Sequence, residues 1–543
     1  MNQWISSLLF IPLIWNYCES QLNVPEELIN EKNIGGAGVK GRLSQKGLAY
    51  VAEFMVNTLI REVTAAAANT EPIDIKTSNG GLLSISNPIL AVQNSQPLRI
   101  RTSPPSLIAI EIPVTSLLVN AQINGNVNGN AINGSLELRP SDPLVHLNVS
   151  VINKQGSPNI RVDQCKVSSP NQVISINSDS SSATELQGTI DGQPFLNDLI
   201  CSRIKFIVED RINVRFGLLS PKISLAYGNE SIILDDVVSK MKARRQRRQS
   251  LLSSFNMSRA DSLFLDYTII SDPFADEAGL EIWSSGEVSL RGRGGTPFGP
   301  IDIKLPEIVN EDYMLKMAVT DFVPNSLMYH GHTIGLFNTK IDPSTPHFGP
   351  IMRTSCNVGT GLLFCLGDLF PTLRRAHPNH RLSLNFATEK APVIKFHPQS
   401  AGGIKFTLTG RIVILLMDNL NSGVETNVAE MRIDVIAHMK LRLSSTSVRP
   451  KITLDSIKLT TLSPGMLLQD ELDDAVLLAR EVLQRMVNDI LQDGIPLPVH
   501  PLFNITKPKV KLMDRALLLQ TNIDLNAQLM RQLTSADLVK QLS

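Results

Sequence analysis

The sequence has no excess of either charge. Its 543 residues contain 51 Lys and Arg against 51 Asp and Glu. Residues 21–300 alone contain 26 Lys and Arg against 27 Asp and Glu, which leaves a net charge of −1. Proteins that bind phosphate-rich polymers through charge normally carry a basic surplus. The balance therefore argues against a nucleic-acid partner.

Recognisable catalytic motifs are also missing. The chain has no Gly-x-Ser-x-Gly nucleophile elbow, no zinc-binding His-Glu-x-x-His helix and no glycine-rich phosphate loop. His330 with His332, and His377 with His380, are close in sequence, but exposed or hydrogen-bonded histidines are the simpler interpretation of such pairs. We therefore expect no enzymatic activity, no metal site and no cofactor.

Long hydrophobic runs are confined to the start of the chain. The run from Ile5 to Trp15 is shorter than the roughly 20 residues that a membrane-spanning helix requires. Small residues follow at Cys18 and Ser20, as in a cleavage site. We therefore interpret residues 1–20 as a signal peptide and expect a secreted, extracellular protein. No Lys or Arg precedes the run, so an uncleaved anchor is the alternative.

Cysteine is scarce, and removal of residues 1–20 would leave four of the five, an even number that suits an oxidising compartment. Proximity favours the pairs Cys165–Cys201 and Cys356–Cys365, one in each half, although sequence alone does not fix the pairing. Neither pair has the two-residue spacing typical of a zinc knuckle. Triplets for N-glycosylation agree with a secretory route and begin at Asn133, Asn148, Asn229, Asn256 and Asn504.

Aromatic residues make up only 5% of the chain, and the aliphatic residues that dominate follow two different periods in the first half. Residues 44–68 repeat apolar side chains at three- and four-residue steps and begin with a serine that can cap a helix. Residues 73–178 alternate apolar and polar side chains, which predicts an antiparallel meander with Asn-Gly turns near Asn124 and Asn128. A second amphipathic helix is expected at 194–214.

The second half repeats this order after a glycine- and proline-rich connection at 291–306. A short helical stretch is expected at 366–375. The clearest helix in the chain runs from Leu468 to Ile490 and ends before Gly494. Further strands are expected at 263–270, 280–290, 314–320, 331–341, 403–416 and 510–519.

Two large domains are the expectation for a chain of this length, because one hydrophobic core seldom organises 543 residues. The shared order of elements predicts an α+β fold of two tandem antiparallel barrels with long amphipathic helices. We place an N-terminal barrel at 21–290, the linker at 291–306 and a C-terminal barrel at 307–543.

Four segments resemble a known family and occur in the family's order. They are "RLSQKGLAYVAEF" at 42–54, the Cys165 and Cys201 spacing around the second helix, "YMLKMAVTDFVPNSL" at 313–327 and "GIPLPVHP" at 494–501. The chain is thereby similar to bactericidal/permeability-increasing protein, lipopolysaccharide-binding protein, phospholipid transfer protein and cholesteryl ester transfer protein.

This resemblance implies an elongated, boomerang-like molecule whose two barrels are joined by a central sheet. Each barrel would hold an apolar pocket for lipid acyl chains. The resemblance also implies that Cys165 and Cys201 form the family's disulfide. Cys356 and Cys365 depart from the family pattern, so their bond rests on proximity alone.

Helix faces, rather than a family motif, select the candidate pocket residues. Plain core packing is the alternative interpretation of both apolar stripes. The candidates are Leu48, Val51, Met55, Leu59 and Val63 on the first helix, and Leu468, Leu472, Val476, Leu483, Met486 and Ile490 on the last.

The expected function is that of a secreted lipid-binding protein that carries or transfers phospholipid or a related lipid and transiently contacts a membrane or lipoprotein surface. The alternative is an innate-immune protein that binds lipopolysaccharide or another microbial glycolipid and acts against microbes. The charge balance of residues 21–300 disfavours lipid A recognition by a broadly cationic domain.

One dense basic tract, residues 240–248, stands out in this neutral background. It has three interpretations: a solvated flexible loop, a proprotein-convertase site cut after Arg248, or a contact with anionic lipid. The sequence does not choose among them.

Overall fold

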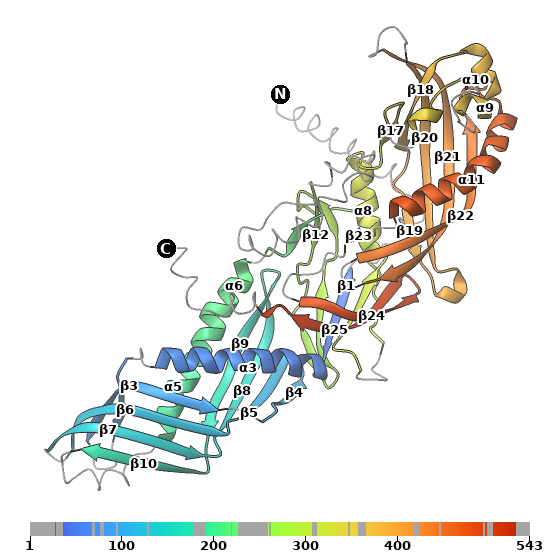
Figure 1. The fold of residues 1–543 in the computed structure, drawn as a ribbon. Helices are drawn as coiled ribbons and strands as arrows, with labels where there is room; N and C mark the ends of the chain where they lie inside the picture. Colours follow the sequence, from blue (N-terminus) through green and yellow to red (C-terminus); the bar gives the residue numbers. More distant parts are fainter. Residues whose placement is uncertain are drawn as a thin grey trace, which may run out of the picture.

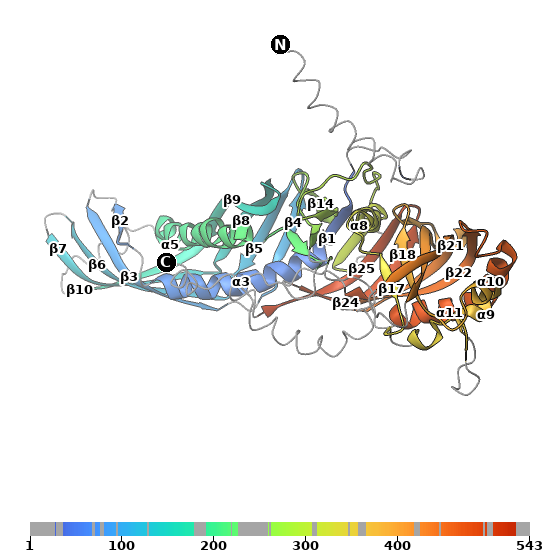
Figure 2. The same cartoon turned by 90° about the horizontal axis from the view of Figure 1, so that it is seen from above.

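The computed structural model is an elongated, mixed α+β molecule built mainly from antiparallel sheet (Figure 1). The N-terminal sheets lie at one end and the C-terminal sheet at the other, as a view turned by 90° confirms (Figure 2). The structure describes residues 28, 36–67, 71–76, 81–93, 96–127, 130–178, 192–218, 220–225, 259, 262–306, 312–345, 348–356, 365–417, 424–444, 447–491, 495–496 and 503–527. The strands among these residues form open sheets, not the closed barrels expected from the sequence.

Two antiparallel sheets form the N-terminal end. The first consists, in spatial order, of β10 (Asn171–Ser178), β7 (Asn130–Ser141), β6 (Ser116–Val127), β3 (Leu82–Gln93) and β2 (Ile73–Lys76). The second consists of β4 (Arg99–Ser103), β5 (Leu107–Pro113), β8 (Leu144–Lys154) and β9 (Ser157–Ser168). Successive strand residues point to opposite faces, so Val145, Leu147 and Val149 of β8 are buried while His146 and Asn148 between them are partly exposed.

The predicted meander is present, but one of its predicted turns is wrong. Asn124 and Gly125 lie inside β6, where they pair with Asn133 and Ile132 of β7. An Asn-Gly pair can continue a strand because its turn preference is weaker than a ladder already fixed by flanking buried residues. The other predicted turn, near Asn128, falls outside the described residues.

Two long helices complete the N-terminal core. The first is α3 (Gln45–Ala67), and the Ser44 Oγ accepts a hydrogen bond from the Gly47 backbone N–H at 3.2 Å, as a helix cap does. The second combines α5 (Gly192–Phe206), a π-helical segment (Ile207–Ile212) and α6 (Asn213–Leu218), which matches the helix predicted at 194–214. Buried residues of these helices and of both sheets form one hydrophobic cluster.

A six-stranded sheet joins the two halves of the molecule. Its spatial order is β13 (Phe274–Asp276), β14 (Gly279–Ser284), β1 (Val39–Ser44), β16 (Leu315–Thr320), β25 (Ala516–Leu525) and β24 (Phe503–Met513). Strand β1 pairs with β14 on one side and with β16 on the other. Segments from the start, the middle and the end of the chain therefore share this central sheet. A small sheet of β11 (Lys222–Ser224), β12 (Leu263–Asp266) and β15 (Val288–Leu290) is separate from it.

The C-terminal end contains the largest sheet. Its main order is β17 (Thr339–Ile341), β18 (Arg381–Thr388), β20 (Ile404–Met417), β21 (Glu425–Leu443), β22 (Ser447–Thr461) and β23 (Ile495–Pro496), and β19 (Val393–Phe396) pairs with β20. The helices of this half are α8 (Phe322–Thr333), α9 (Leu366–Leu369), α10 (Pro371–Ala376) and α11 (Gln469–Leu491).

Two strand predictions in this half are wrong. The strand predicted at 331–341 is helix as far as Thr333, because tertiary contacts hold α8: the Asn325 side chain bonds both the N–H and the C=O of Ile394. The single strand predicted at 510–519 is the hairpin of β24 and β25. Its turn contains Arg515 at a φ of 60°, which an ordinary strand pattern does not reveal.

Candidate functional site

An apolar cavity of about 50 Å³ lies between the two N-terminal helices and the sheets. All twelve lining side chains are aliphatic, so a water molecule inside would find no side-chain hydrogen-bond partner. Such a cavity suits hydrocarbon better than water. The lining residues are Val56, Leu59, Ile60, Val63, Leu90, Val92, Ile112, Val114, Leu117, Val145, Ile200 and Ile204.

Of the five candidates on the first helix, the structure brings Leu59 and Val63 to this cavity. Leu48 is buried in the same core at 6% exposure but is not among the lining residues. Val51 and Met55 are half-buried and do not line the cavity either. The buried stripe of α3 passes through Val56 and not through Val51 or Met55. The buried face is therefore rotated around the helix axis by one residue relative to the predicted face.

Sequence reasoning missed this rotation because the middle of α3 is apolar at adjacent positions. Val51 with Ala52, and Met55 with Val56, offer two stripes of similar hydrophobicity. The lining residues Ile200 and Ile204 do belong to the apolar face predicted for the second helix. The six lining residues from the sheet region were missed because periodicity does not show which part of a sheet a helix covers.

The candidates on the last helix show a similar division. Leu472 is fully buried in a second hydrophobic cluster, and Val476 is half-buried. Leu468 is 45% exposed, precedes α11 and is not part of that cluster. The side chains of Leu483, Met486 and Ile490 lie outside what the structure describes.

The second helix of the N-terminal half runs along the free edge of β9, a contact that we call the first seam. Asn213 bonds both backbone groups of Ile160: its Oδ1 accepts from the N–H at 2.8 Å and its Nδ2 donates to the C=O at 2.6 Å. Glu209 accepts from the Val162 N–H at 2.9 Å. The disulfide between Cys165 on β9 and Cys201 on α5 crosses this seam.

The helix α11 runs along β22 in the same way, and we call this contact the second seam. Asn488 Oδ1 accepts from the Ile452 N–H at 2.7 Å, and its Nδ2 donates to the Ile452 C=O at 2.8 Å. Gln484 accepts from the Leu454 N–H at 2.9 Å. Both seams thus pair side chains four apart on a helix with residues two apart on a strand. Neither β22 nor α11 contains a cysteine, so only the first seam carries a disulfide.

Side-chain amides and carboxylates satisfy strand groups that would otherwise face away from any neighbouring strand. A helix held in this way closes the open edge of a sheet without adding another strand. This arrangement explains how open sheets enclose an apolar interior at each end of the molecule.

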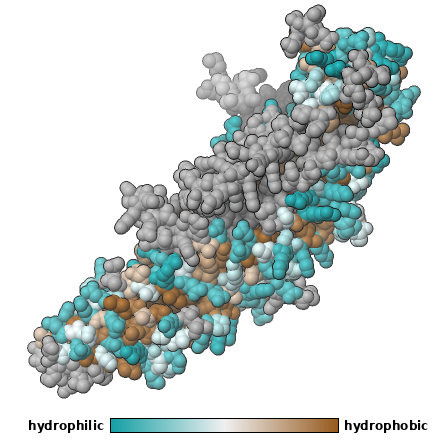
Figure 3. All heavy atoms as spheres, viewed as in Figure 1, coloured by the Kyte–Doolittle hydropathy of each residue, from teal (hydrophilic) through white to brown (hydrophobic). Residues whose placement is uncertain are grey.

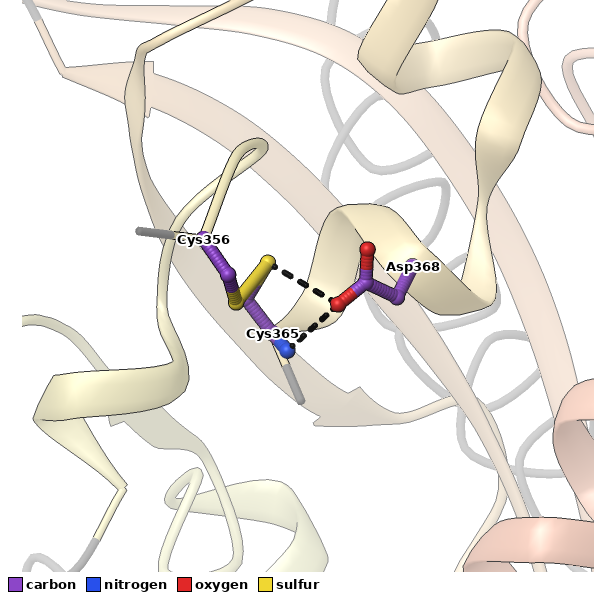
Figure 4. Close-up of side chains that lie close together, drawn as sticks. All are labelled: Cys356, Cys365 and Asp368. Carbon is purple, nitrogen blue, oxygen red and sulfur yellow. Dashed lines mark hydrogen bonds between the residues drawn. A yellow bond between two sulfur atoms is a disulfide. The ribbon is translucent and has the colours of Figure 1, made fainter. Parts of the chain in front are cut away.

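The second disulfide, Cys356–Cys365, lies beside α9 (Figure 4). Asp368 points at it: one carboxylate oxygen accepts a hydrogen bond from the Cys365 backbone N–H at 3.0 Å and lies 3.3 Å from the Cys365 sulfur. These three residues are close enough to hold a metal ion. Because both sulfurs are joined to each other, however, they are not thiolate ligands, and the group serves as a cross-link at the start of α9.

The histidine pairs have ordinary surroundings. His332 lies 2.6 Å from the Thr388 hydroxyl, and burial lowers the pKa of its ring. His330, two residues earlier on α8, is 3.9 Å from a carboxylate oxygen of Glu287. The His377 and His380 rings stack edge to face, with 6.1 Å between their centroids.

The predicted modification sites fall partly within the described residues. Asn133 and Asn504 are exposed on strands, whereas Asn148 is half-buried and donates to Gln164. Asn229, Asn256, the basic tract at 240–248 with Arg248, and residues 1–20 lie outside the described residues.

Apolar side chains also reach the surface of the N-terminal end (Figure 3). Leu82 and Ile89 on β3 are 50% and 63% exposed, and Val173 on β10 is 62% exposed. Among the described residues, no helix combines the length and the apolar character needed to cross a membrane.

Comparison with known proteins finds a matching family model and a similar solved structure. Residues 257–525 match the model of the LBP / BPI / CETP family, C-terminal domain. The structure is similar to a crystal structure of lipopolysaccharide binding protein, with a TM-score of 0.51, 17% sequence identity, and coverage of 90% of this chain and 99% of that one. Takeout 1 of Epiphyas postvittana aligns over 25% of this chain and 76% of its own at 13% identity, but its TM-score of 0.20 is too low to indicate a shared fold.

No curated protein sequence matches the chain. The family match covers the central sheet strands β13, β14, β16, β24 and β25 together with the whole C-terminal sheet. The structural similarity extends the same fold across the N-terminal half. The chain is therefore a member of the LBP / BPI / CETP family.

Proposed function

We propose that this protein is a secreted lipid carrier that holds the acyl chains of a phospholipid or related lipid in its N-terminal cavity. The observation that carries the proposal is the wholly aliphatic lining of that cavity, shared by α3, α5 and the two sheets. Membership of a family whose name includes lipopolysaccharide binding protein and a transfer protein supports a lipid ligand. The sequence motifs offer no route to catalysis, so binding rather than chemical conversion is the proposed activity.

The energetics suit reversible loading. Removing one methylene from water is worth about 0.8 kcal/mol. A diacyl lipid with about 30 methylenes therefore gains on the order of 25 kcal/mol before the cost of ordering its chains. A bilayer offers the same chains an equally apolar environment, so exchange between membrane and protein is close to neutral. Specificity must then come from contacts with the headgroup.

The cavity is much smaller than an acyl chain needs, because even an apolar protein cavity of about 150 Å³ accommodates only a molecule the size of benzene. A lipid therefore requires α3 and α5 to move away from the sheets as it binds. We propose that the cavity of about 50 Å³ is the closed form of a larger pocket.

We further propose that each half encloses lipid like an open barrel and that the central sheet joins the two into the boomerang outline that the resemblance implies. In this scheme residues 1–20 are a signal peptide, 21–290 and 307–543 are the two containers, and 291–306 connects them. Exposed Leu82, Ile89 and Val173 support transient contact with a membrane or lipoprotein surface.

The test is mass spectrometry of lipid bound to the secreted, full-length protein. Ile60→Asp places a charge in the cavity lining and should lower the bound lipid several-fold, because an unpaired carboxylate among acyl chains is costly. Val51→Asp is the matched control on the same helix, since Val51 does not line the cavity. Absence of lipid from the unmodified protein, or equal lipid in both folded variants, would contradict the proposal.

The second candidate is an innate-immune binder of lipopolysaccharide or another microbial glycolipid. The observation in its favour is the similarity to lipopolysaccharide binding protein over 90% of this chain. Such binding should weaken strongly with added salt, because the glycolipid phosphates are charged. Transfer of host phospholipid between vesicles that salt scarcely changes would favour the carrier.

A further inference from the structure

Two arginines lie against one exposed aromatic ring on the second N-terminal helix. The guanidinium carbons of Arg203 and Arg211 lie 5.4 Å and 5.2 Å from the ring centroid of Phe206. Phe206 is 40% exposed, which is unusual for a large apolar side chain on a helix that faces the core. At these distances each cation is weakly attracted to the ring.

The cluster carries more positive than negative charge. Glu62 on α3 is 3.4 Å from an Arg211 nitrogen, and its other oxygen is 3.6 Å from Arg61. Among the described residues, Arg203 has no carboxylate within ion-pair distance, and its Nε is buried without a hydrogen-bond partner. Burial and then the positive charge of Arg211 lower the pKa of Arg203, while Glu62 acts in the opposite direction.

The cluster lies beside the aliphatic cavity. In sequence, Arg203 lies between Ile200 and Ile204 on α5. Glu62 likewise lies between Ile60 and Val63 on α3. All four of these aliphatic residues line the cavity. A lipid whose chain enters between the two helices would therefore have its headgroup within reach of the arginines.

We propose that Arg203, Phe206 and Arg211 bind the phosphate of a lipid headgroup whose acyl chain occupies the cavity. This inference rests on the proposed function and assigns the headgroup class for the same site: an anionic, phosphate-bearing lipid. A guanidinium presents paired donors that match phosphate oxygens. A phosphate between the two arginines would supply the acceptor that the Arg203 Nε lacks and would neutralise the repulsion between the two cations. The exposed face of Phe206 would pack against the glycerol and the first methylenes of the chain.

The experiment loads delipidated full-length protein from vesicles that contain phosphatidylglycerol and diacylglycerol with identical acyl chains. Mass spectrometry then gives the ratio of the two bound lipids. Arg203→Gln should lower this ratio about tenfold, since a hydrogen bond to a charged group is worth roughly that factor or more. Lys205→Gln is the matched control, because Lys205 is an exposed cation on the same helix. Arg203 has no ion pair among the described residues, so its replacement should leave the thermal unfolding temperature unchanged.

The outcomes separate this inference from the proposed function. If the unmodified protein loads neither lipid, the proposed function fails. If it loads lipid but Arg203→Gln leaves the ratio unchanged, or Lys205→Gln lowers it equally, the headgroup site is overturned. A last experiment adds inorganic phosphate at millimolar concentration to the loaded protein. Full displacement of phosphatidylglycerol by phosphate, without loss of diacylglycerol, would show a free-phosphate site and would also overturn the inference.

Discussion

The second seam should open more readily than the first when its amide contact is removed. Asn213→Ala and Asn488→Ala are matched changes, because each asparagine bonds the N–H and the C=O of one strand residue, Ile160 or Ile452. The first seam is also crossed by a disulfide, and the second is not. Removal of the amide therefore leaves the first helix covalently tethered, whereas the second helix is held only by its remaining noncovalent contacts.

The magnitude follows from the pair of hydrogen bonds that each substitution removes. Each alanine leaves one backbone N–H and one C=O without its partner, and an unsatisfied group costs about 1–3 kcal/mol when buried. Both strand residues are partly exposed, so we take about 2 kcal/mol in total, which is roughly a 30-fold change in the equilibrium for local opening.

Hydrogen exchange of strand amides measures this opening directly. In Asn488→Ala, amides around Ile452 and Leu454 should exchange about 30-fold faster under conditions in which exchange reports the opening equilibrium. In Asn213→Ala, acceleration around Ile160 and Val162 should be several-fold smaller.

Removal of the tether provides the control. Asn213→Ala combined with Cys165→Ser and Cys201→Ser should bring exchange at the first seam up to that of the second. Equal acceleration in the two single variants would refute the argument that the disulfide makes the seams unequal. Absence of acceleration in both would show that the asparagine contacts do not hold the helices to the strands.

Three further changes test other parts of the structure. Gly47→Ala should lower the free energy of unfolding, measured with denaturant, by roughly 1–3 kcal/mol, because the added Cβ would lie 2.4 Å from the Met314 carbonyl oxygen. Gly465→Ala is the control, because open space surrounds that position, and it should leave the free energy of unfolding unchanged. Asp321→Asn should lower the free energy of unfolding by about 3–5 kcal/mol, because the Arg515 guanidinium, 2.6 Å from an Asp321 oxygen, would stay largely buried without its counter-charge. An unchanged midpoint of denaturant unfolding would contradict this prediction. Burial lowers the pKa of His332, so its contribution to stability should be present above its unfolded pKa of about 6.5 and lost as pH falls through the lower folded value. The drop in unfolding temperature from pH 7 to pH 5 should be smaller in His332→Gln, and an identical drop would argue against this role.

Much of the local structure was predictable from the sequence, because it depends on neighbours along the chain. The period of α3 and the capping position of Ser44 predict a helix that the structure begins at Gln45. The alternation in β8 and the apolar face of the second helix are equally local. The failures came where tertiary contacts outweighed local pattern. Residues 331–333 are helical although the pattern predicts a strand at 331–341, because they end a helix that the Asn325 contact to Ile394 holds in place.

The candidate site likewise has some features that the sequence determined and others that only the tertiary structure decided. Sequence determined that α3 and the second helix each carry an apolar face, that cysteines stand at 165 and 201, and that an arginine follows two residues after the second of these. Only the tertiary structure decided that Val56 rather than Met55 lines the cavity and that Arg203 and Arg211 both lie against the Phe206 ring. It also decided that β1 joins strands more than 200 residues away, since Val39 pairs with Ser284 and Val319. Periodicity fixes which side of an element is apolar, but the partner that covers this side is chosen by packing between segments distant in sequence.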